Sequence, residues 1–193
     1  MAKFVHYKQL DAMDCGATCL RMIAKYYGRS YSAQTLRQRS YITREGVSLL
    51  GISDAAESIG MHTMGVKTSI EKLIEENVTP FIAHWRQEHF VVVYGFKKAS
   101  LRGSMTKQSA KDKEITSSQA PRNDVKVLVA DPAEGLITYT KQEFLKYWAS
   151  SEKNGEKQGI ALLLEPTPNF YEQKGEKIDK TKFSFLFKTR DRI

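Results

Sequence analysis

The segment from Gln9 to Gly28 constrains the fold of this 193-residue chain more than any other stretch. Its apolar residues recur at the spacing of one helix face, and they are Cys15, Cys19, Met22, Ile23 and Tyr26. Gly28 suits the left-handed position that follows a helix end, and Asp14, or as a second choice Asp11, suits the N-cap. The pattern therefore predicts an amphipathic helix that begins at Cys15 and packs on a core.

The position of Cys15 in the first helical turn allows two interpretations. Unpaired backbone N–H groups and the positive end of the helix dipole favour a thiolate over a thiol there. Gln9 lies six positions upstream, and its amide could donate a hydrogen bond to an oxyanion forming next to the sulfur. The alternative is a buried core cysteine, which is common for free cysteines. Cys19, in mid-helix without a polar neighbour, fits that alternative.

Composition limits the class of protein. The length corresponds to one domain, or to one domain plus a tail. Two cysteines four residues apart on one helix face suit neither a disulfide nor a metal site, so we expect a reducing compartment. The sequence has no recognisable signal peptide or apolar run of transmembrane length. The net charge of +8 comes from scattered Lys and Arg residues. This favours a basic soluble surface over nucleic-acid binding, with attraction to an anionic membrane as a third interpretation.

The order of the expected elements predicts the fold class. After the first helix we expect helices from Ser32 to about Gln38, from Ser48 to Gly60, and from Ser69 onward. Thr140 and Glu143 have the spacing of a capping box and should open a later helix. Strand-like segments cover residues 61–67, 80–85, 89–95, 125–130, 136–140 and 159–165. Helices precede a largely antiparallel sheet, which indicates an α+β domain.

Two segments do not fit this domain. Residues 98–124 are polar and lack an apolar period, so we expect an exposed, mobile insertion that is either a neutral decoration or a partner-binding loop. Residues 169–193 mix aromatic residues with many lysines, and we expect a poorly packed linker. The domain itself is therefore expected to span residues 1–168.

A thiolate nucleophile needs a base and a group that orients the base. Of the four histidines, His6 and His62 are most simply surface residues or residues with satisfied hydrogen bonds. His84 lies inside a strand, where a structural role is more common than a catalytic one. His89 opens the most apolar strand directly after a polar turn, where a cleft can form. If this strand pairs antiparallel with the one that ends at Asp131, the two side chains lie at one sheet end, and the carboxylate can fix the imidazole tautomer.

These residues together resemble a known family. Gln9, Asp14-Cys15-Gly16, His89-Phe-Val-Val-Val and Asp131-Pro132 are similar to the signature of the papain-like, double-glycine leader peptidase domains of peptidase-containing ABC transporters. The resemblance runs from about residue 3 to residue 167. It implies a papain-like cysteine peptidase fold, with Cys15 as nucleophile, His89 as general base and acid, Asp131 as orienting residue and Gln9 as oxyanion donor.

The resemblance also implies a substrate and partners. The substrate would be a precursor peptide, a bacteriocin or a signalling peptide, whose helical leader is cut after Gly-Gly. The partners would be the transmembrane and ATPase domains of the same transporter, which would follow the segment 169–193 and form a homodimer. No cofactor is expected for the peptidase, whereas ATP and Mg²⁺ belong to the ATPase domain. The expected location is the cytoplasmic face of the bacterial inner membrane.

One departure and two alternative functions stay open. The family usually joins the strands of His and Asp by a short turn, whereas residues 98–124 intervene here. This insertion leaves open how a substrate reaches the site and which partner binds, but it removes no catalytic residue. Family members without the cysteine act only as docking modules, so a non-cleaving module that binds cargo for a transporter is one alternative. A papain-like transferase that uses the same triad on another acyl group is the other.

Overall fold

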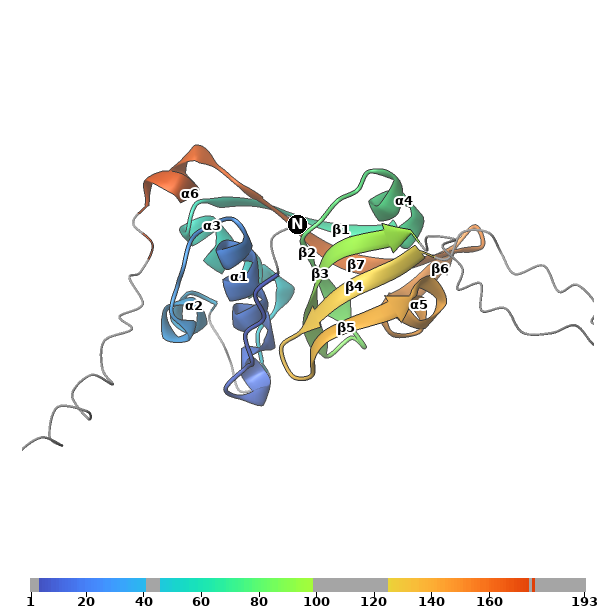
Figure 1. Cartoon of the computed structure of the whole chain (residues 1–193), viewed down its shortest axis with the longest axis horizontal. Helices are drawn as coiled ribbons and strands as arrows, with labels where there is room; N and C mark the ends of the chain where they lie inside the picture. The colour runs from blue at the N-terminus through green and yellow to red at the C-terminus, as the bar shows by residue number, and fades with distance from the viewer. Residues whose placement is uncertain (1–3, 41–45, 99–124, 174, 176–193) are drawn as a thin grey trace, which may run out of the picture.

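The structure is a computed structural model that describes residues 4–40, 46–98, 125–173 and 175. A group of helices packs against one end of a curved antiparallel sheet (Figure 1). Two further helices lie at the opposite end of the sheet, where β6 also lies (Figure 1). The α+β class expected from the sequence is therefore confirmed, because helices and an antiparallel sheet share one domain.

The helices begin at the residues that their capping patterns indicate. The side chain of Ser32 accepts a hydrogen bond from the Thr35 N–H at 3.1 Å, and Ser48 accepts one from the Gly51 N–H at 3.0 Å. Thr140 and Glu143 form the expected capping box. The helices are η1 (Ala12–Asp14), α1 (Cys15–Tyr26), α2 (Ala33–Arg39), α3 (Leu49–Ser58), α4 (Ile70–Glu75), α5 (Lys141–Trp148) and α6 (Pro168–Glu172).

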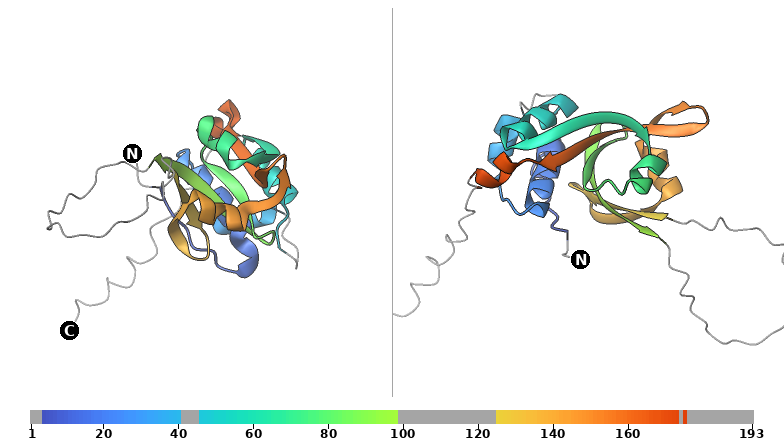
Figure 2. Two further views of the ribbon diagram at one scale, coloured as in Figure 1. Left: turned by 90° about the vertical axis from the view of Figure 1, so that its right-hand side faces the viewer. Right: turned by 90° about the horizontal axis from the view of Figure 1, so that it is seen from above.

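Within the described residues the sheet has seven strands, and all of their pairs are antiparallel. The strands are β1 (Met61–Ser69), β2 (Phe81–Trp85), β3 (His89–Lys98), β4 (Val125–Asp131), β5 (Gly135–Thr140), β6 (Ala149–Lys153) and β7 (Glu156–Pro166). Their order is β1-β7-β2-β3-β4-β5, and β6 pairs with β7. The long strands β1 and β7 run together from the α1–α3 group to the far end of the sheet (Figure 2).

Alternation along the strands gives the sheet two buried faces. Val92 belongs to the core cluster that includes α1 and α3, whereas its neighbours Val91 and Val93 belong to the cluster that includes α5. β2 shows the same split, with Ile82 on the first side and Phe81 on the second. The continuous apolar run that begins at Phe90 is thus explained, because successive side chains point to opposite faces and both faces are covered.

The hairpin of β3 and β4 decides where the predicted base and carboxylate lie. The two strands pair antiparallel, with Val92 opposite Ala130 at one end and Lys98 opposite Val125 at the other. His89 begins β3 and Asp131 ends β4, so both residues lie at the same end of the sheet. The pairing that we considered possible from the sequence is therefore present.

The tail and the insertion require separate comment. We expected poor packing from residue 169 onward, but this was wrong for Phe170, which is fully buried in α6 and belongs to the α1–α3 core. The mixture of aromatic and lysine residues hid this short helix, whose proline at the first turn is a favoured position. β6, which is mostly polar, was also missed. The insertion from residue 99 to 124 and the segment 176–193 lie outside the described residues.

Candidate active site

Cys15 is the first residue of α1, as the sequence predicts, and it is 5 % exposed. Gly16 allows the start of α1 to pack closely against neighbouring residues. A Cβ atom on Gly16 would lie 2.4 Å from Val47 Cγ1 and 2.6 Å from Ile52 Cδ1. Only glycine therefore allows the start of α1 to approach α3 and the residues before it this closely.

Asp14 is the N-cap residue of α1, as we expected, but its side chain makes no capping hydrogen bond to the helix. The 3₁₀ turn η1 precedes α1, and the carboxylate points back to accept a hydrogen bond from the Asp11 N–H at 3.2 Å. Its Oδ1 atom forms an ion pair with Nε of Arg37 at 2.9 Å. Arg37, from α2, thus compensates a buried negative charge directly before Cys15.

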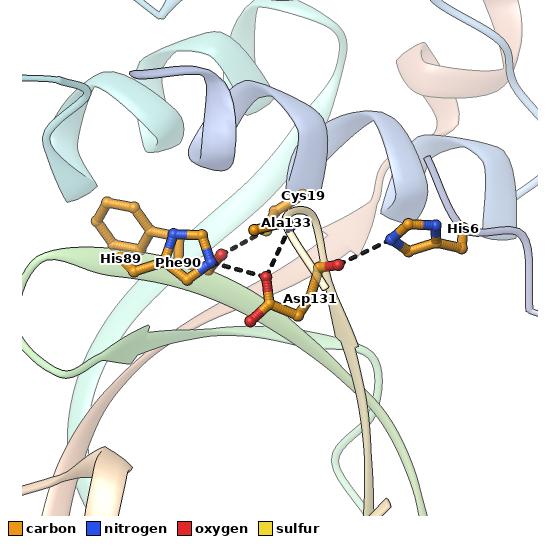
Figure 3. A network of polar contacts seen from close by, with 6 residues as sticks. All are labelled: His6, Cys19, His89, Phe90, Asp131 and Ala133. Carbon is orange, nitrogen blue, oxygen red and sulfur yellow. Dashed lines mark hydrogen bonds and ion pairs between the residues drawn. The ribbon is translucent and has the colours of Figure 1, made fainter. Parts of the chain in front are cut away.

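His89 and Asp131 form the contact that the sequence predicts. His89 Nε2 lies 2.9 Å from Asp131 Oδ1, and the same oxygen accepts a hydrogen bond from the Ala133 N–H at 2.8 Å (Figure 3). Because Nε2 is engaged with the carboxylate, Nδ1 is the ring nitrogen left for Cys15. The side chain of Cys15 also interacts with the ring of His89, which completes the row of three residues.

The pKa values of the pair shift in opposite directions. Burial lowers the pKa of His89, but hydrogen bonds with Asp131 and Cys15, together with the charges of both, raise it to about 9. Burial raises the pKa of Asp131, but hydrogen bonds from His89 and from the Ala133 N–H outweigh this and lower it. At neutral pH the ring is therefore an imidazolium beside the sulfur, the arrangement that activates a cysteine nucleophile.

The N-terminal segment is bound to the turn that follows β4. His6 Nε2 lies 2.8 Å from the carbonyl oxygen of Asp131, on the side of this residue away from His89 (Figure 3). The Gln9 N–H donates to the carbonyl oxygen of Pro132 at 3.0 Å. Gln9 is thereby held beside the Asp131 turn, and its side-chain oxygen is buried without a hydrogen-bond partner among the described residues.

His6 has a partner that sequence reasoning did not identify. We expected a surface histidine or one with its hydrogen bonds satisfied, and the ring is partly buried and bonded to the backbone of Asp131. The two residues are 125 positions apart, and no periodicity carries a signal over that distance. The other expectations hold, because His62 is exposed and His84 stacks on Phe90 with ring centroids 5.0 Å apart.

A cavity of about 510 Å³ lies between the start of α3 and the turn from β2 to β3. Phe90, the residue after His89, lines it together with Val47, whose side chain packs against the start of α1. The cavity wall therefore includes the residue that follows His89 and a residue that packs against the start of α1. Its lining residues are Val47, Ser48, Leu49, His84, Gln87, Glu88 and Phe90.

In the described part of the chain, no group of three or more His, Cys, Asp or Glu residues could hold a metal ion. Within the same residues, no helix combines the length and the apolar character needed to cross a membrane.

The fold and this row of residues define the chain as a cysteine peptidase domain. Residues 3–102, more than half of the chain, match the Peptidase C39 family. The chain belongs to the Peptidase C39 family. The family resemblance stated from the motifs alone is thereby confirmed.

Named relatives share most of this chain. It is 28 % identical over 180 residues to the transport/processing ATP-binding protein ComA of Streptococcus pneumoniae, an alignment that covers 89 % of this chain and 20 % of ComA. It is 29 % identical over 197 residues to the lactococcin-G-processing and transport ATP-binding protein LagD of Lactococcus lactis subsp. lactis, covering 98 % of this chain and 23 % of LagD. The chain thus spans about a fifth of the length of these relatives.

Solved structures show the same fold. A double glycine motif protease from an AMS/PCAT transporter, in complex with the leader peptide, superposes with a TM-score of 0.63 at 27 % identity, covering 86 % of this chain and 94 % of that one. The peptidase domain of Streptococcus ComA superposes with a TM-score of 0.60 at 26 % identity, covering 86 % of this chain and 100 % of that one.

Proposed function

We propose that this domain is an endopeptidase that cuts a precursor peptide after a Gly-Gly motif, with Cys15 as nucleophile. The observation that carries the proposal is the ring of His89, which interacts with Asp131 on one side and Cys15 on the other. Three groups in this order constitute an activated nucleophile, its proton carrier and an orienting carboxylate.

The catalytic cycle follows from these positions. The Cys15 thiolate attacks the carbonyl carbon of the second glycine, and the His89 imidazolium gives its proton to the departing amine as the peptide bond breaks. His89, now neutral, then takes a proton from water, and the resulting hydroxide attacks the thioester and releases the leader acid and Cys15. Asp131 holds Nε2 throughout, so that the ring presents Nδ1 to the reacting atoms.

Gln9 is the proposed oxyanion donor. Its backbone N–H donates to the carbonyl oxygen of Pro132, which follows Asp131, and this hydrogen bond holds the residue beside the Asp131 turn. An amide N–H beside the sulfur would stabilise the negative charge that forms on the carbonyl oxygen of the substrate.

The substrate class is supported by similarity. The double glycine motif protease that shares this fold was solved with the leader peptide bound, and the names of ComA and LagD include processing. We therefore assign this chain a precursor peptide with a double-glycine leader. Its identity, antimicrobial or signalling, is left to experiment.

Incubation with a synthetic double-glycine precursor tests the assignment. Mass spectrometry should show two fragments that separate after the second glycine. A matched precursor with Val-Val in place of Gly-Gly should stay intact, and a peptide aldehyde that ends in Gly-Gly should trap Cys15. Cleavage of both precursors at equal rates would contradict the proposed specificity. An intact Gly-Gly precursor that nevertheless binds would favour the non-cleaving cargo module.

We further propose that the domain works within an ABC exporter that is powered by ATP at the cytoplasmic face of the bacterial inner membrane. Support comes from the names of ComA and LagD, which include transport and ATP-binding, and from their greater length. Reading the gene on either side of these residues tests this, since membrane helices and a Walker motif should be encoded. Cross-linking of the whole protein in membranes tests the proposed homodimer.

The peptidase step itself should need no cofactor, because a thiolate and an imidazolium supply the nucleophile and the acid. Addition of EDTA should leave the cleavage rate of the isolated domain unchanged. A loss of activity that Zn²⁺ or Mg²⁺ restores would contradict this expectation.

A further inference from the structure

The second cysteine of α1 makes a contact that the proposed cycle does not use. Cys19 is fully buried one helical turn after Cys15, and its thiol donates a hydrogen bond to the carbonyl oxygen of Phe90 at 3.2 Å. Figure 3 shows this bond running from α1 down to β3, directly beside the ring of His89.

The carbonyl of Phe90 has a particular need for this donor. On one side of β3, His89 and Phe90 pair with β2. On the other side, β3 and β4 pair only from Val92 and Ala130 onward, so neither His89 nor Phe90 has a paired residue on β4 among the described residues. Phe90 is only 4 % exposed. A buried carbonyl group without a partner is costly, and the Cys19 thiol supplies a donor where the neighbouring strand is missing.

Two links therefore join the helix to the strand. Cys15 interacts with His89, and Cys19 binds Phe90, so residues four apart on α1 contact consecutive residues of β3. Two polar contacts separated by about one helical turn of 5.4 Å set the orientation of the strand end against the helix more closely than one contact would.

We propose that Cys19 is a positioning residue, whose hydrogen bond to Phe90 holds His89 at the correct distance and angle from Cys15. The proposal rests on the catalytic roles assigned to Cys15 and His89. Misplacement of reacting groups by fractions of an ångström reduces rates even when the groups themselves are unchanged.

The environment of Cys19 suits a donor rather than a second nucleophile. Burial first, and then the charges of Cys15 and Asp131, raise the pKa of Cys19 well above its ordinary value. The thiol therefore stays protonated, keeps its hydrogen for Phe90 and does not compete with Cys15 for substrate.

Three substitutions separate the hydrogen bond from packing. Cys19→Ser keeps a donor, Cys19→Ala removes it, and Cys19→Val removes it while filling the space. Ile23→Val, at another fully buried position of α1, serves as a control for packing loss alone. Each protein is tested for the rate of Cys15 alkylation by iodoacetamide, with the site located by peptide mapping, for kcat and KM on the precursor, and for thermal unfolding.

We expect Cys19→Ala and Cys19→Val to slow alkylation of Cys15 and to lower kcat by about fivefold to tenfold, the scale of one hydrogen bond, with KM changed less than about twofold. Cys19→Ser should stay within about twofold of the wild type, as should Ile23→Val despite its lower melting temperature.

Several results would overturn the proposal. One is wild-type alkylation and kcat in both Cys19→Ala and Cys19→Val. Another is an equal loss in Cys19→Ser and Cys19→Val, since retention of a donor would then not matter. A third is a loss that disappears after correction for the folded fraction. Alkylation needs no peptide substrate, so failure of the wild type to cut the precursor would count against the proposed function alone.

Discussion

The two faces of the sheet differ in what they contain. One face is covered by the α1–α3 group, and α1 contributes both cysteines. This face continues to the end of the sheet where His89 and Asp131 lie. The opposite face, covered by α4 and α5, holds a packed aromatic cluster. Its members are Trp85, Tyr139, Phe144, Tyr147 and Trp148.

The two faces therefore contribute differently to the chemistry and to the stability of the domain. In the aromatic cluster, the ring centroids of Trp85 and Phe144 are 5.2 Å apart and those of Phe144 and Trp148 are 5.4 Å apart. Such contacts stabilise a fold without contributing to a reaction. The helix-covered face stabilises the fold too, but its contacts also set the distance between nucleophile and base. Substitutions on the two faces should therefore have different signatures.

Cys15→Ala should have the largest effect on activity. Removal of the sulfur removes the proposed nucleophile, so cleavage should fall by at least about 10⁴-fold. The melting temperature should stay close to that of the wild type, because only a small side chain is shortened. Fragment release measured by mass spectrometry, with calorimetry as control, tests this. Residual cleavage near the wild-type rate would place the chemistry elsewhere.

Asp131→Asn should have the next largest effect. The amide cannot stabilise the imidazolium, and it can hold the wrong tautomer of His89, so kcat should fall by about 10³–10⁴-fold. The pKa of His89, about 9 in the wild type, should fall when the carboxylate is lost. NMR titration of the ring protons measures this shift, and an unchanged titration would contradict the assigned partner.

The same group predicts a pH dependence of stability. Because the pKa of His89 is raised above its ordinary value of 6.5, its contribution to the free energy of unfolding is complete below about pH 6.5. That contribution is lost as the pH rises through about 9. Urea unfolding at a series of pH values should show the decline in the wild type and a smaller one in Asp131→Asn. Equal declines of the free energy of unfolding with pH in the two proteins would contradict the contribution assigned to His89.

Gln9→Ala should reduce turnover by about 10²–10³-fold while substrate binding stays nearly intact, because one oxyanion donor is lost. The backbone hydrogen bond to Pro132 should survive this change. Steady-state kinetics and binding to the Cys15→Ala background separate the two quantities. An equal rise in the dissociation constant would show that Gln9 binds substrate instead.

Phe144→Ala probes the aromatic face. Truncation of this fully buried side chain should lower the free energy of unfolding by about 3–5 kcal/mol. The kcat of the molecules that remain folded should stay within about twofold of the wild type. Lys146→Ala, an exposed position of the same helix, is the matched control. A large loss of kcat in folded Phe144→Ala would break the proposed separation of the two faces.

Deletion of residues 100–122 should have the smallest effect. Lys98 and Val125 are paired at the end of the β3–β4 hairpin, so a short turn can join them, far along both strands from His89 and Asp131. We expect fold and basal activity to persist, as measured by circular dichroism and precursor cleavage. Loss of soluble protein would show that the insertion is part of the core.

Much of this molecule could be predicted from the sequence because its signals are local. The stripe that contains Cys15 and Cys19 predicts α1, and the capping residues Ser32, Ser48 and Thr140 predict helix starts that the structure has. The strand ends predict that His89 and Asp131 meet. These predictions need only periodicity, capping and one antiparallel pairing.

The remainder depends on contacts between distant segments. His6 binds the backbone of Asp131, Arg37 pairs with Asp14, and Phe170 fills a place in the core. None of these residues stands in a repeating pattern, and each partner is determined only once the sheet and helices have packed. Capping preferences alone also mispredicted the Asp14 side chain, because a 3₁₀ turn precedes the helix.

The hydrogen bonds of His6 and Gln9 to the turn after β4 have a practical consequence. They bind the amino-terminal segment to the turn that carries Asp131. A shortened chain beginning at residue 10 would retain the sulfur, the imidazole and the carboxylate, yet it would lose both hydrogen bonds that hold this turn from outside. Affinity tags intended for work on this enzyme are therefore better attached elsewhere than directly before Phe4.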